Sequence, residues 1–180
     1  MSMLGSTIIH QIVYEQKILS PEKILMELNR GIRYSLKQQD SQNRDGMDVA
    51  LCVFNKETKM LRFSGAKNPL VYVNEDGLNT IKGDKFPIGG FQMDEEYKFT
   101  CHSIQIEKPT GIYLFSDGYQ DQFGGPKGKK YMIKRLRERI QEQWKEPYVN
   151  QWLYFEKEFN EWKGSQEQLD DILLIGFQVK

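Results

Sequence analysis

The sequence predicts an α+β domain in which layers of antiparallel strands are covered by helices. Helical patterns stand near both ends of the chain, and short apolar runs fill its middle. Turn residues separate these runs, not helices, which excludes βαβ winding there. Hydrophobic residues make up 39% and aromatic residues 12% of the chain, which is typical of a packed core. The length of 180 residues predicts a single domain.

The balance of acidic and basic residues argues against a nucleic-acid partner. Lys plus Arg total 25 and Asp plus Glu total 25, so the formal net charge is zero and a nucleic-acid footprint is not expected. No apolar run approaches the roughly 20 residues of a membrane helix, and no signal peptide is visible. Cys52 and Cys101 are typical of thiols in a reducing compartment. We therefore expect a cytoplasmic domain without direct membrane insertion.

Two helices are predicted before the strands. Residues 1–16 carry apolar side chains at helical spacing, but no capping residue precedes them. Two interpretations are open: a frayed N-terminal helix, or a helix whose beginning lies before Met1. The second helix is expected to begin with Ser20 as N-cap and Pro21 at its first position, and to run to about Gln39.

Strands and two further helices follow in order. Strand-like runs, joined by turns such as "KETK" and "NEDG", are predicted at 47–55, 60–66, 69–74, 78–83, 97–106 and 112–115. Helical patterns cover 129–144 and 146–164, and a buried strand introduced by two acids closes the chain at 170–180. The spacing of the aromatic residues in the last helix predicts a packing face: Tyr148, Trp152, Phe155, Phe159 and Trp162.

Acidic residues stand at two strand ends. Asp117 follows the apolar run of "IYLFSDG", and Asp170 and Asp171 precede the apolar run of "DDILLIGF". If these strands are neighbours, their carboxylates converge and repel each other unless a cation lies between them. Oxygen ligands suit Mg²⁺ or Mn²⁺, whereas His10 and His102, the only histidines, are too few for an imidazole zinc site. The alternative is ordinary turn chemistry, since Asp-Gly is a common turn dipeptide.

Five segments in this order resemble a known family: "GMDVALCVFN", "LRFSGAKNPLVYV", "FPIGG", "IYLFSDGYQDQFGG" and "QLDDILLIGF". The sequence is similar to the PPM metal-dependent protein phosphatases of the bacterial SpoIIE-like branch. The resemblance extends from Met1 to about Val179. It implies two stacked antiparallel sheets flanked by helices, an α-β-β-α sandwich.

The resemblance also implies an activity and its residues. Family members hydrolyse phosphoserine and phosphothreonine on proteins with two Mn²⁺ or Mg²⁺ ions, which activate a water. Asp117 and Asp170 match metal-ligand aspartates, and Asp171 matches a supporting position. Gly118 matches the glycine that turns the loop beside the metal site. The expected partners are a phosphorylated regulatory protein of anti-anti-sigma type and an upstream sensor in a parent protein, which a membrane segment could tether.

One family motif has no match here. Relatives carry D-x-x-G-H-G before their first helix, with an aspartate that bridges both ions, and this sequence contains no such motif. The resemblance therefore favours a domain that is incomplete at its N-terminus. We expect one metal ion or none and little or no activity, because repulsion between two cations would be poorly neutralised. A homodimer is expected to cover the sheet edge left exposed.

Two other functions stay open on the sequence alone. One is a non-catalytic signalling module of the same fold that binds a phosphoprotein. The other is an unrelated α+β domain whose acids are turn residues.

Overall fold

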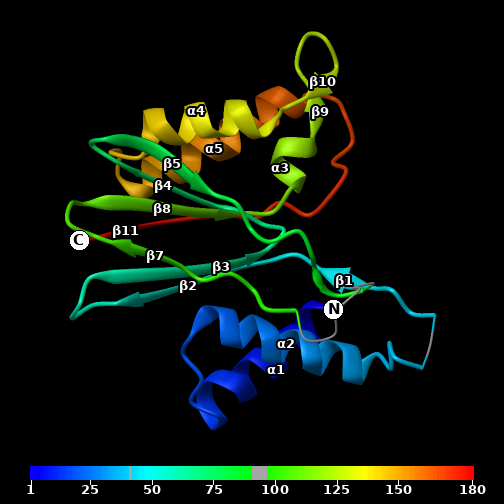
Figure 1. Cartoon of the computed structure of the whole chain (residues 1–180). Helices are drawn as coiled ribbons and strands as arrows, with labels where there is room; N and C mark the ends of the chain where they lie inside the picture. The colour runs from blue at the N-terminus through cyan, green and yellow to red at the C-terminus, as the bar shows by residue number, and fades with distance from the viewer. Residues whose placement is uncertain (41, 91–96) are drawn as a thin grey trace. The chain divides into compact units, whose positions relative to one another are not determined.

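The computed structural model of the chain describes residues 1–40, 42–90 and 97–180 (Figure 1). These residues form two compact units. Unit 1 comprises Met1–Leu70 and Ile81–Glu107, and unit 2 comprises Val71–Thr80 and Lys108–Lys180. The prediction of a single domain over residues 1–180 stays a prediction. Every acidic residue singled out above lies in unit 2.

Unit 1 is an antiparallel sheet covered by helices. Its helical segments are α1 (Ser2–His10), the π-helical segment η1 (Gln11–Glu15) and α2 (Pro21–Ser35). Its strands are β1 (Gly46–Met47), β2 (Val49–Asn55), β3 (Met60–Ala66), β6 (Ile88–Gly89) and β7 (His102–Gln105). The strands pair in the order β2-β3-β7, with β1 and β6 as a separate ribbon. Helix α2 packs against β2 and β3 (Figure 1).

Helix α2 follows its predicted apolar stripe. Ile24, Leu25, Leu28 and Ile32 are at most 2% exposed and form the core of unit 1 with the strands. Ser20 stands at the N-cap position as predicted, but its hydroxyl donates to the Glu22 carboxylate at 2.6 Å and makes no cap hydrogen bond to the backbone. The helix ends at Ser35, four residues before the predicted end.

The sheet of unit 2 has the order β11-β8-β4-β5. Its strands are β4 (Leu70–Asn74), β5 (Gly77–Ile81), β8 (Thr110–Phe115) and β11 (Leu174–Val179). Its helices are α3 (Gly118–Asp121), α4 (Ile133–Gln143) and α5 (Tyr148–Lys163). A short hairpin joins α3 to α4 and consists of β9 (Phe123–Gly124) and β10 (Lys129–Lys130). The predicted α+β class with antiparallel sheets and covering helices is confirmed.

The core of unit 2 joins its sheet to α4 and α5. Val71, Val73 and Tyr113 of the sheet lie in one cluster with helical side chains. The buried members from α4 and α5 are Leu136, Ile140, Phe155 and Phe159. The predicted aromatic packing face of α5 is thus only partly right, because Tyr148 and Trp152 are 53% and 62% exposed.

Two predicted element boundaries in unit 2 were wrong. The helical pattern from Lys129 was expected to start a helix there, but Lys129 and Lys130 form strand β10 and α4 begins only at Ile133. Met132, with φ at 72°, separates the two elements. The final strand was expected from Asp170, but β11 begins at Leu174, so both acids lie in the loop before it.

None of the helices in residues 1–40, 42–90 and 97–180 combines the length and apolar character needed to cross a bilayer.

Candidate active site

Strand pairing brings the two acidic segments together. β8 and β11 run antiparallel, with Phe115 opposite Leu174. The chain after β8 and the chain before β11 therefore leave the sheet at the same end. Asp117 lies on the first of these segments, and Asp170 and Asp171 lie on the second.

Ser116 fastens the two segments to each other. Its backbone N–H donates to the Leu173 carbonyl at 3.0 Å, and the Leu173 N–H donates to the Ser116 hydroxyl oxygen at 3.0 Å. The hydroxyl in turn donates to the Asp171 carbonyl at 3.0 Å. These bonds extend the β8–β11 pairing beyond the regular strands, up to the residues beside Asp117.

The closest approach involves Gly118, the first residue of α3. A Cβ atom at Gly118 would lie 2.4 Å from the Asp171 carbonyl oxygen and 3.4 Å from the Asp170 Cβ. Real Cβ atoms do not approach a backbone oxygen this closely, so only glycine fits here. The predicted residues Asp117, Gly118, Asp170 and Asp171 are thus on contacting segments at one end of the sheet.

The acidic side chains at this place meet solvent. Asp117, Asp170 and Asp171 are all exposed. One Asp170 oxygen accepts the Asp171 backbone N–H at 2.7 Å, and the Asp170 carbonyl accepts from the Gln168 side chain at 2.9 Å. These local bonds shape the loop that carries Asp170. The Asp117 carboxylate, at the N-cap of α3, makes no side-chain cap hydrogen bond.

Gln122 is a positioning residue whose role the sequence did not reveal. It is fully buried, and its side-chain N–H₂ donates to the carbonyls of Phe123 and Glu167 at 3.0 and 2.9 Å. Its side-chain oxygen accepts from the Leu169 N–H at 3.3 Å. Gln122 therefore ties the chain after α3 to the residue before Asp170. The only sequence signal is a glutamine between "GYQD" and "FGG", and it does not show which partners the side chain meets.

Tyr119 holds α3 against α5. Its hydroxyl donates to the Phe155 carbonyl at 2.9 Å, and its ring packs edge-on against Tyr131 at 5.0 Å. Burial raises the pKa of Tyr119 far above its ordinary value, so the phenol stays protonated. Tyr119 anchors the segment that carries Asp117 and Gly118 in the core of unit 2.

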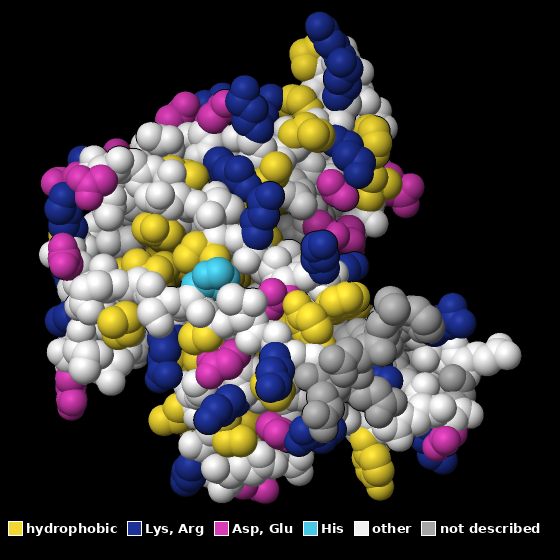
Figure 2. Space-filling view, viewed as in Figure 1, with side chains coloured by type: hydrophobic (Ala, Val, Ile, Leu, Met, Phe, Trp, Pro, Cys, Tyr) yellow, Lys and Arg dark blue, Asp and Glu magenta, His cyan; other side chains and the backbone are white. Residues whose placement is uncertain are grey.

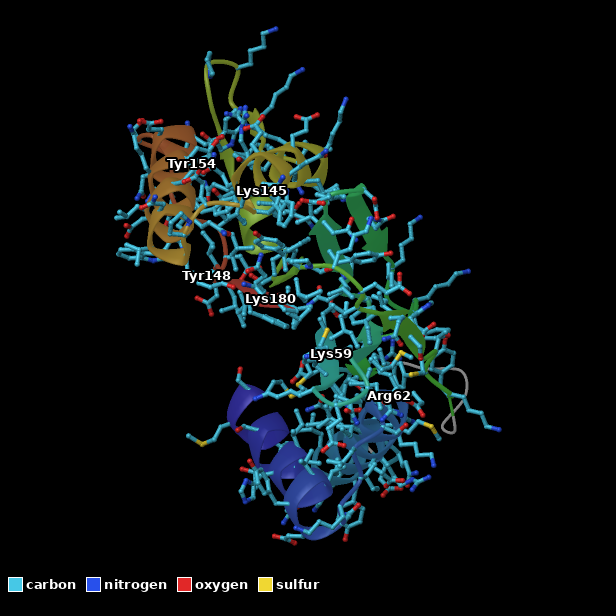
Figure 3. All side chains as sticks on the ribbon, turned by 90° about the vertical axis from the view of Figure 1, so that its left-hand side faces the viewer. Lys59, Arg62, Lys145, Tyr148, Tyr154 and Lys180 are labelled. Atoms are coloured by element: carbon cyan, nitrogen blue, oxygen red, sulfur yellow. The ribbon has the colours of Figure 1, made fainter. Side chains whose placement is uncertain are left out.

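A cavity of about 830 Å³ opens beside Asp171. Its wall is formed by α5 and the start of β11 and includes Tyr148, Trp152, Phe155, Phe159, Asp171 and Leu173. Figure 3 shows Tyr148, at the start of α5, on the side of unit 2 that carries Lys180, the residue after β11. The wall extends from there to Asp171. The exposed aromatic side chains of α5 therefore line a hollow that reaches the acidic segments.

The donor atoms at this place are of the kind that Mn²⁺ and Mg²⁺ prefer. Asp117, Asp170 and Asp171 carry exposed carboxylate oxygens. Within the described parts of the chain, however, no three or more His, Cys, Asp or Glu side chains are grouped so that they could hold a metal ion. The oxygen ligands are of the type that a Mg²⁺ or Mn²⁺ site uses. Their number is lower than a high-affinity metal site needs.

The cysteines offer no nucleophile. Both are free thiols in unit 1. Burial raises the pKa of Cys52 to about 12 and that of Cys101 to about 11, the latter helped by the Glu22 carboxylate. At neutral pH both are therefore protonated and unreactive.

Comparison with protein families identifies the chain. The model described as Stage II sporulation protein E (SpoIIE) matches residues 1–180. The chain belongs to the SpoIIE family. The predicted resemblance to the SpoIIE-like branch is thereby confirmed. A comparison with curated proteins found no match.

Several solved structures share the fold of this chain. The SiaA-PP2C domain of Pseudomonas aeruginosa is 24% identical, with a TM-score of 0.87 over 99% of this chain and 69% of that chain. The phosphatase domain of SpoIIE from Bacillus subtilis, presoaked with Mn, is 14% identical, with a TM-score of 0.58 over 99% and 71%. RsbX in complex with magnesium is 14% identical, with a TM-score of 0.63 over 98% and 73%. These likenesses show that the chain has the PP2C-type phosphatase fold.

Proposed function

We propose that this SpoIIE-family chain is a metal-dependent protein serine/threonine phosphatase domain. The observation that carries the proposal is the contact of the Asp117–Gly118 segment with Asp170 and Asp171 at the paired ends of β8 and β11. The two segments that leave the sheet side by side present carboxylates to solvent, which suits a site that must hold a cation and admit a protein-bound phosphate.

Each residue has a distinct role in this proposal. Asp117 and Asp170 hold the metal ion, Asp171 supports them, and Gly118 keeps the two segments in contact. When bound, Mn²⁺ or Mg²⁺ supplies an acidified water as nucleophile and neutralises charge on the phosphoryl oxygens. Ser116 and Gln122 hold the acidic segments at fixed separation through the bonds described above.

Metal binding by the 180-residue polypeptide is expected to be weak. The described residues group fewer than three acidic or imidazole side chains around one point, and the sequence has no D-x-x-G-H-G aspartate. Two cations held there would repel each other with too little negative charge between them. The expected occupancy is one ion or none, and the expected turnover is slow.

Phosphatase assays test this function. The polypeptide is incubated with a chromogenic phosphate ester and with phosphoserine, phosphothreonine and phosphotyrosine peptides, with Mn²⁺, Mg²⁺ or EDTA. We expect slow, Mn²⁺-stimulated release of phosphate that EDTA stops and that favours phosphoserine and phosphothreonine. The Asp117→Asn variant should be at the background rate. Hydrolysis that neither EDTA nor Asp117→Asn reduces would contradict the proposal.

A second candidate function is a non-catalytic module of the same fold that binds a phosphoprotein. It is favoured by the lack of a three-residue acidic group within the described residues. It predicts phosphopeptide binding without turnover at any Mn²⁺ concentration. The assay above therefore separates the two candidates.

The proposed substrate is a phosphorylated bacterial regulatory protein of anti-anti-sigma type in the cytoplasm. We further propose that a sensor domain of a longer parent protein controls the site. Both parts of the proposal rest on the family resemblance. The cavity beside Asp171 supports a protein substrate, since it offers an apolar surface next to the acidic segments.

We also propose a homodimer through β11. This strand stands at one end of the strand order in the sheet of unit 2. Leu173 and Ile175 are 55% and 44% exposed, and residues 172–179 include no charged side chain. Natural sheet edges usually carry charges or proline that prevent pairing, so this edge is suited to a second copy.

Light scattering coupled to size-exclusion chromatography tests the dimer. We expect about twice the 21.2 kDa chain mass for the wild type and the single-chain mass for Ile175→Lys, which places a charge on the edge. Val149→Lys, at an apolar position of α5 that is 67% exposed, is the matched control and should stay dimeric. A wild-type mass of one chain would overturn the dimer.

A further inference from the structure

The β9–β10 hairpin carries a concentrated positive charge. Its sequence "FGGPKGKKYM", residues 123–132, contains Lys127, Lys129 and Lys130 and no acid. All three lysines are exposed. Figure 2 shows dark-blue side chains standing out at the tip that Figure 1 labels β9 and β10. The chain as a whole has a formal charge of zero, so this positive charge is a local excess.

The hairpin has a defined conformation. Gly124 pairs with Lys129 and Phe123 pairs with Lys130. The Gly128 N–H donates to the Gly125 carbonyl at 3.1 Å and closes the turn, in which Gly128 has φ at +57°. The lysines are therefore presented from a fixed turn.

Trp162 anchors the hairpin to the end of α5. The Gly125 N–H donates to the Trp162 carbonyl at 2.7 Å, and the Trp162 indole N–H donates to the Gln122 carbonyl at 3.1 Å. A Cβ at Gly124 would lie 1.9 Å from the Trp162 carbonyl oxygen, so the two backbones are in direct contact. The base of the hairpin is thus held by the same Gln122 that positions the segment before Asp170.

One lysine links the hairpin to the candidate active site. Lys130 forms an ion pair with Asp121 at 3.1 Å, and the Asp121 N–H donates to the Asp117 carbonyl at 2.9 Å. The positive hairpin therefore begins one helical turn beyond Asp117. Lys127 and Lys129 have no ion-pair partner among the residues that the structure describes, so their charges are available to a ligand.

We infer that the β9–β10 hairpin is a docking arm for the acidic residues that flank the phosphorylated side chain of the protein substrate. This inference rests on the proposed function, which places the phosphate at Asp117 and Asp170. The hairpin projects beyond α3 at the end of unit 2 where β8 ends (Figure 1). Flanking residues of a substrate that extend along α3 from a phosphate at that end would therefore meet Lys127 and Lys129 in its turn. The arm selects substrates by charge and speeds their encounter with the site.

The charge pattern favours an acidic protein segment over nucleic acid. The formal net charge of the chain is zero, and a nucleic-acid-binding chain usually carries a net positive charge. A protein segment with a few acidic residues beside a phosphate matches a single turn that presents three lysines.

Direct binding tests the docking arm without requiring catalysis. Fluorescence anisotropy is measured with a labelled phosphoserine peptide flanked by glutamates, and with the same peptide flanked by lysines, in EDTA. We expect the acidic peptide to bind more tightly. We expect the Lys127→Glu/Lys129→Glu variant to bind the acidic peptide about tenfold more weakly than the wild type. The difference between the two affinities should become smaller as the salt concentration is raised.

A second hairpin provides the matched control. The turn between β2 and β3 carries exposed Lys56 and Lys59 on both sides of Glu57. Lys56→Glu/Lys59→Glu changes the total charge equally but should leave peptide binding unchanged. If both double variants lose the same affinity for the acidic peptide, the effect is one of net charge and the inference is wrong.

The remaining outcomes separate this inference from the proposed function. Hydrolysis of the small chromogenic ester should be the same in the wild type and in Lys127→Glu/Lys129→Glu, because that ester has no flanking residues. If no hydrolysis is found but peptide binding depends on the hairpin, the catalytic function is wrong and the docking arm is supported. Hairpin-dependent binding of single-stranded DNA or phosphatidylserine vesicles, but not of the acidic peptide, would overturn the docking arm.

Discussion

Replacing Gly118 with alanine is expected to force the two acidic segments apart. The new Cβ would lie 2.4 Å from the Asp171 carbonyl oxygen, which is backbone and cannot rotate away. Overpacking of this kind costs about 1–3 kcal/mol of unfolding free energy. Because the displaced segment carries Asp170 and Asp171, the metal response should be lost together with part of the stability.

Chemical denaturation and Mn²⁺ titration measure the two effects of Gly118→Ala separately. Gly77→Ala is the control, since Gly77 has φ at +123° and no heavy atom near its would-be Cβ. That variant should lose stability of about 1 kcal/mol through backbone strain and keep the wild-type response to Mn²⁺. A Gly118→Ala variant with unchanged stability and unchanged metal binding would show that the close contact is not needed.

Replacing Asp117 or Asp170 with asparagine is expected to remove stabilisation by Mn²⁺. A ligand at ten times its Kd stabilises the folded chain by about 1.4 kcal/mol. For a chain of this size that shifts Tm by roughly 3–6 °C. Asparagine keeps the size of the side chain but loses its negative charge, so each variant should show little or none of this shift.

Thermal melts in millimolar Mn²⁺ and in EDTA check this prediction. Asp76→Asn is the control within unit 2, because Asp76 is a surface residue paired with Lys108 at 2.8 Å in the β4–β5 turn. It should melt within a degree or so of the wild type and keep the full Mn²⁺ shift, since exposed ion pairs contribute little. If Asp117→Asn and Asp170→Asn keep the shift as Asp76→Asn does, the acids are turn residues and bind no metal.

Local patterns predicted most elements of the fold because their physical causes are local. The stripe of Ile24, Leu25, Leu28 and Ile32 has helical spacing, and α2 buries it. The turns "KETK" and "NEDG" connect antiparallel strands as expected. The errors occur where local preference and tertiary contact differ. The sequence from Lys129 favours helix, but the contact of Gly124 and Gly125 with Trp162 holds this stretch as a hairpin.

The sequence predicted the residues of the candidate site but not their contact with one another. Acid residues at strand ends can be recognised from the apolar runs beside them, so Asp117, Asp170 and Asp171 could be named. Their contact depends on which strand pairs with β8, and pairing between residues more than 50 positions apart is not encoded in any local pattern. The positioning roles of Gln122 and Ser116 were not visible for the same reason, because the partners of these side chains are distant in the chain.

By itself, the sequence determined the α+β class, the acidic residues at two strand ends and the resemblance to SpoIIE-like phosphatases, because residue type and spacing set backbone preference and donor chemistry. Only the tertiary structure decided that Gly118 touches Asp171, that a hollow of aromatic side chains reaches the acids, and that the lysine hairpin begins one helical turn from Asp117. These features depend on contacts between distant segments, which form only when the sheet of unit 2 pairs its last strand with β8.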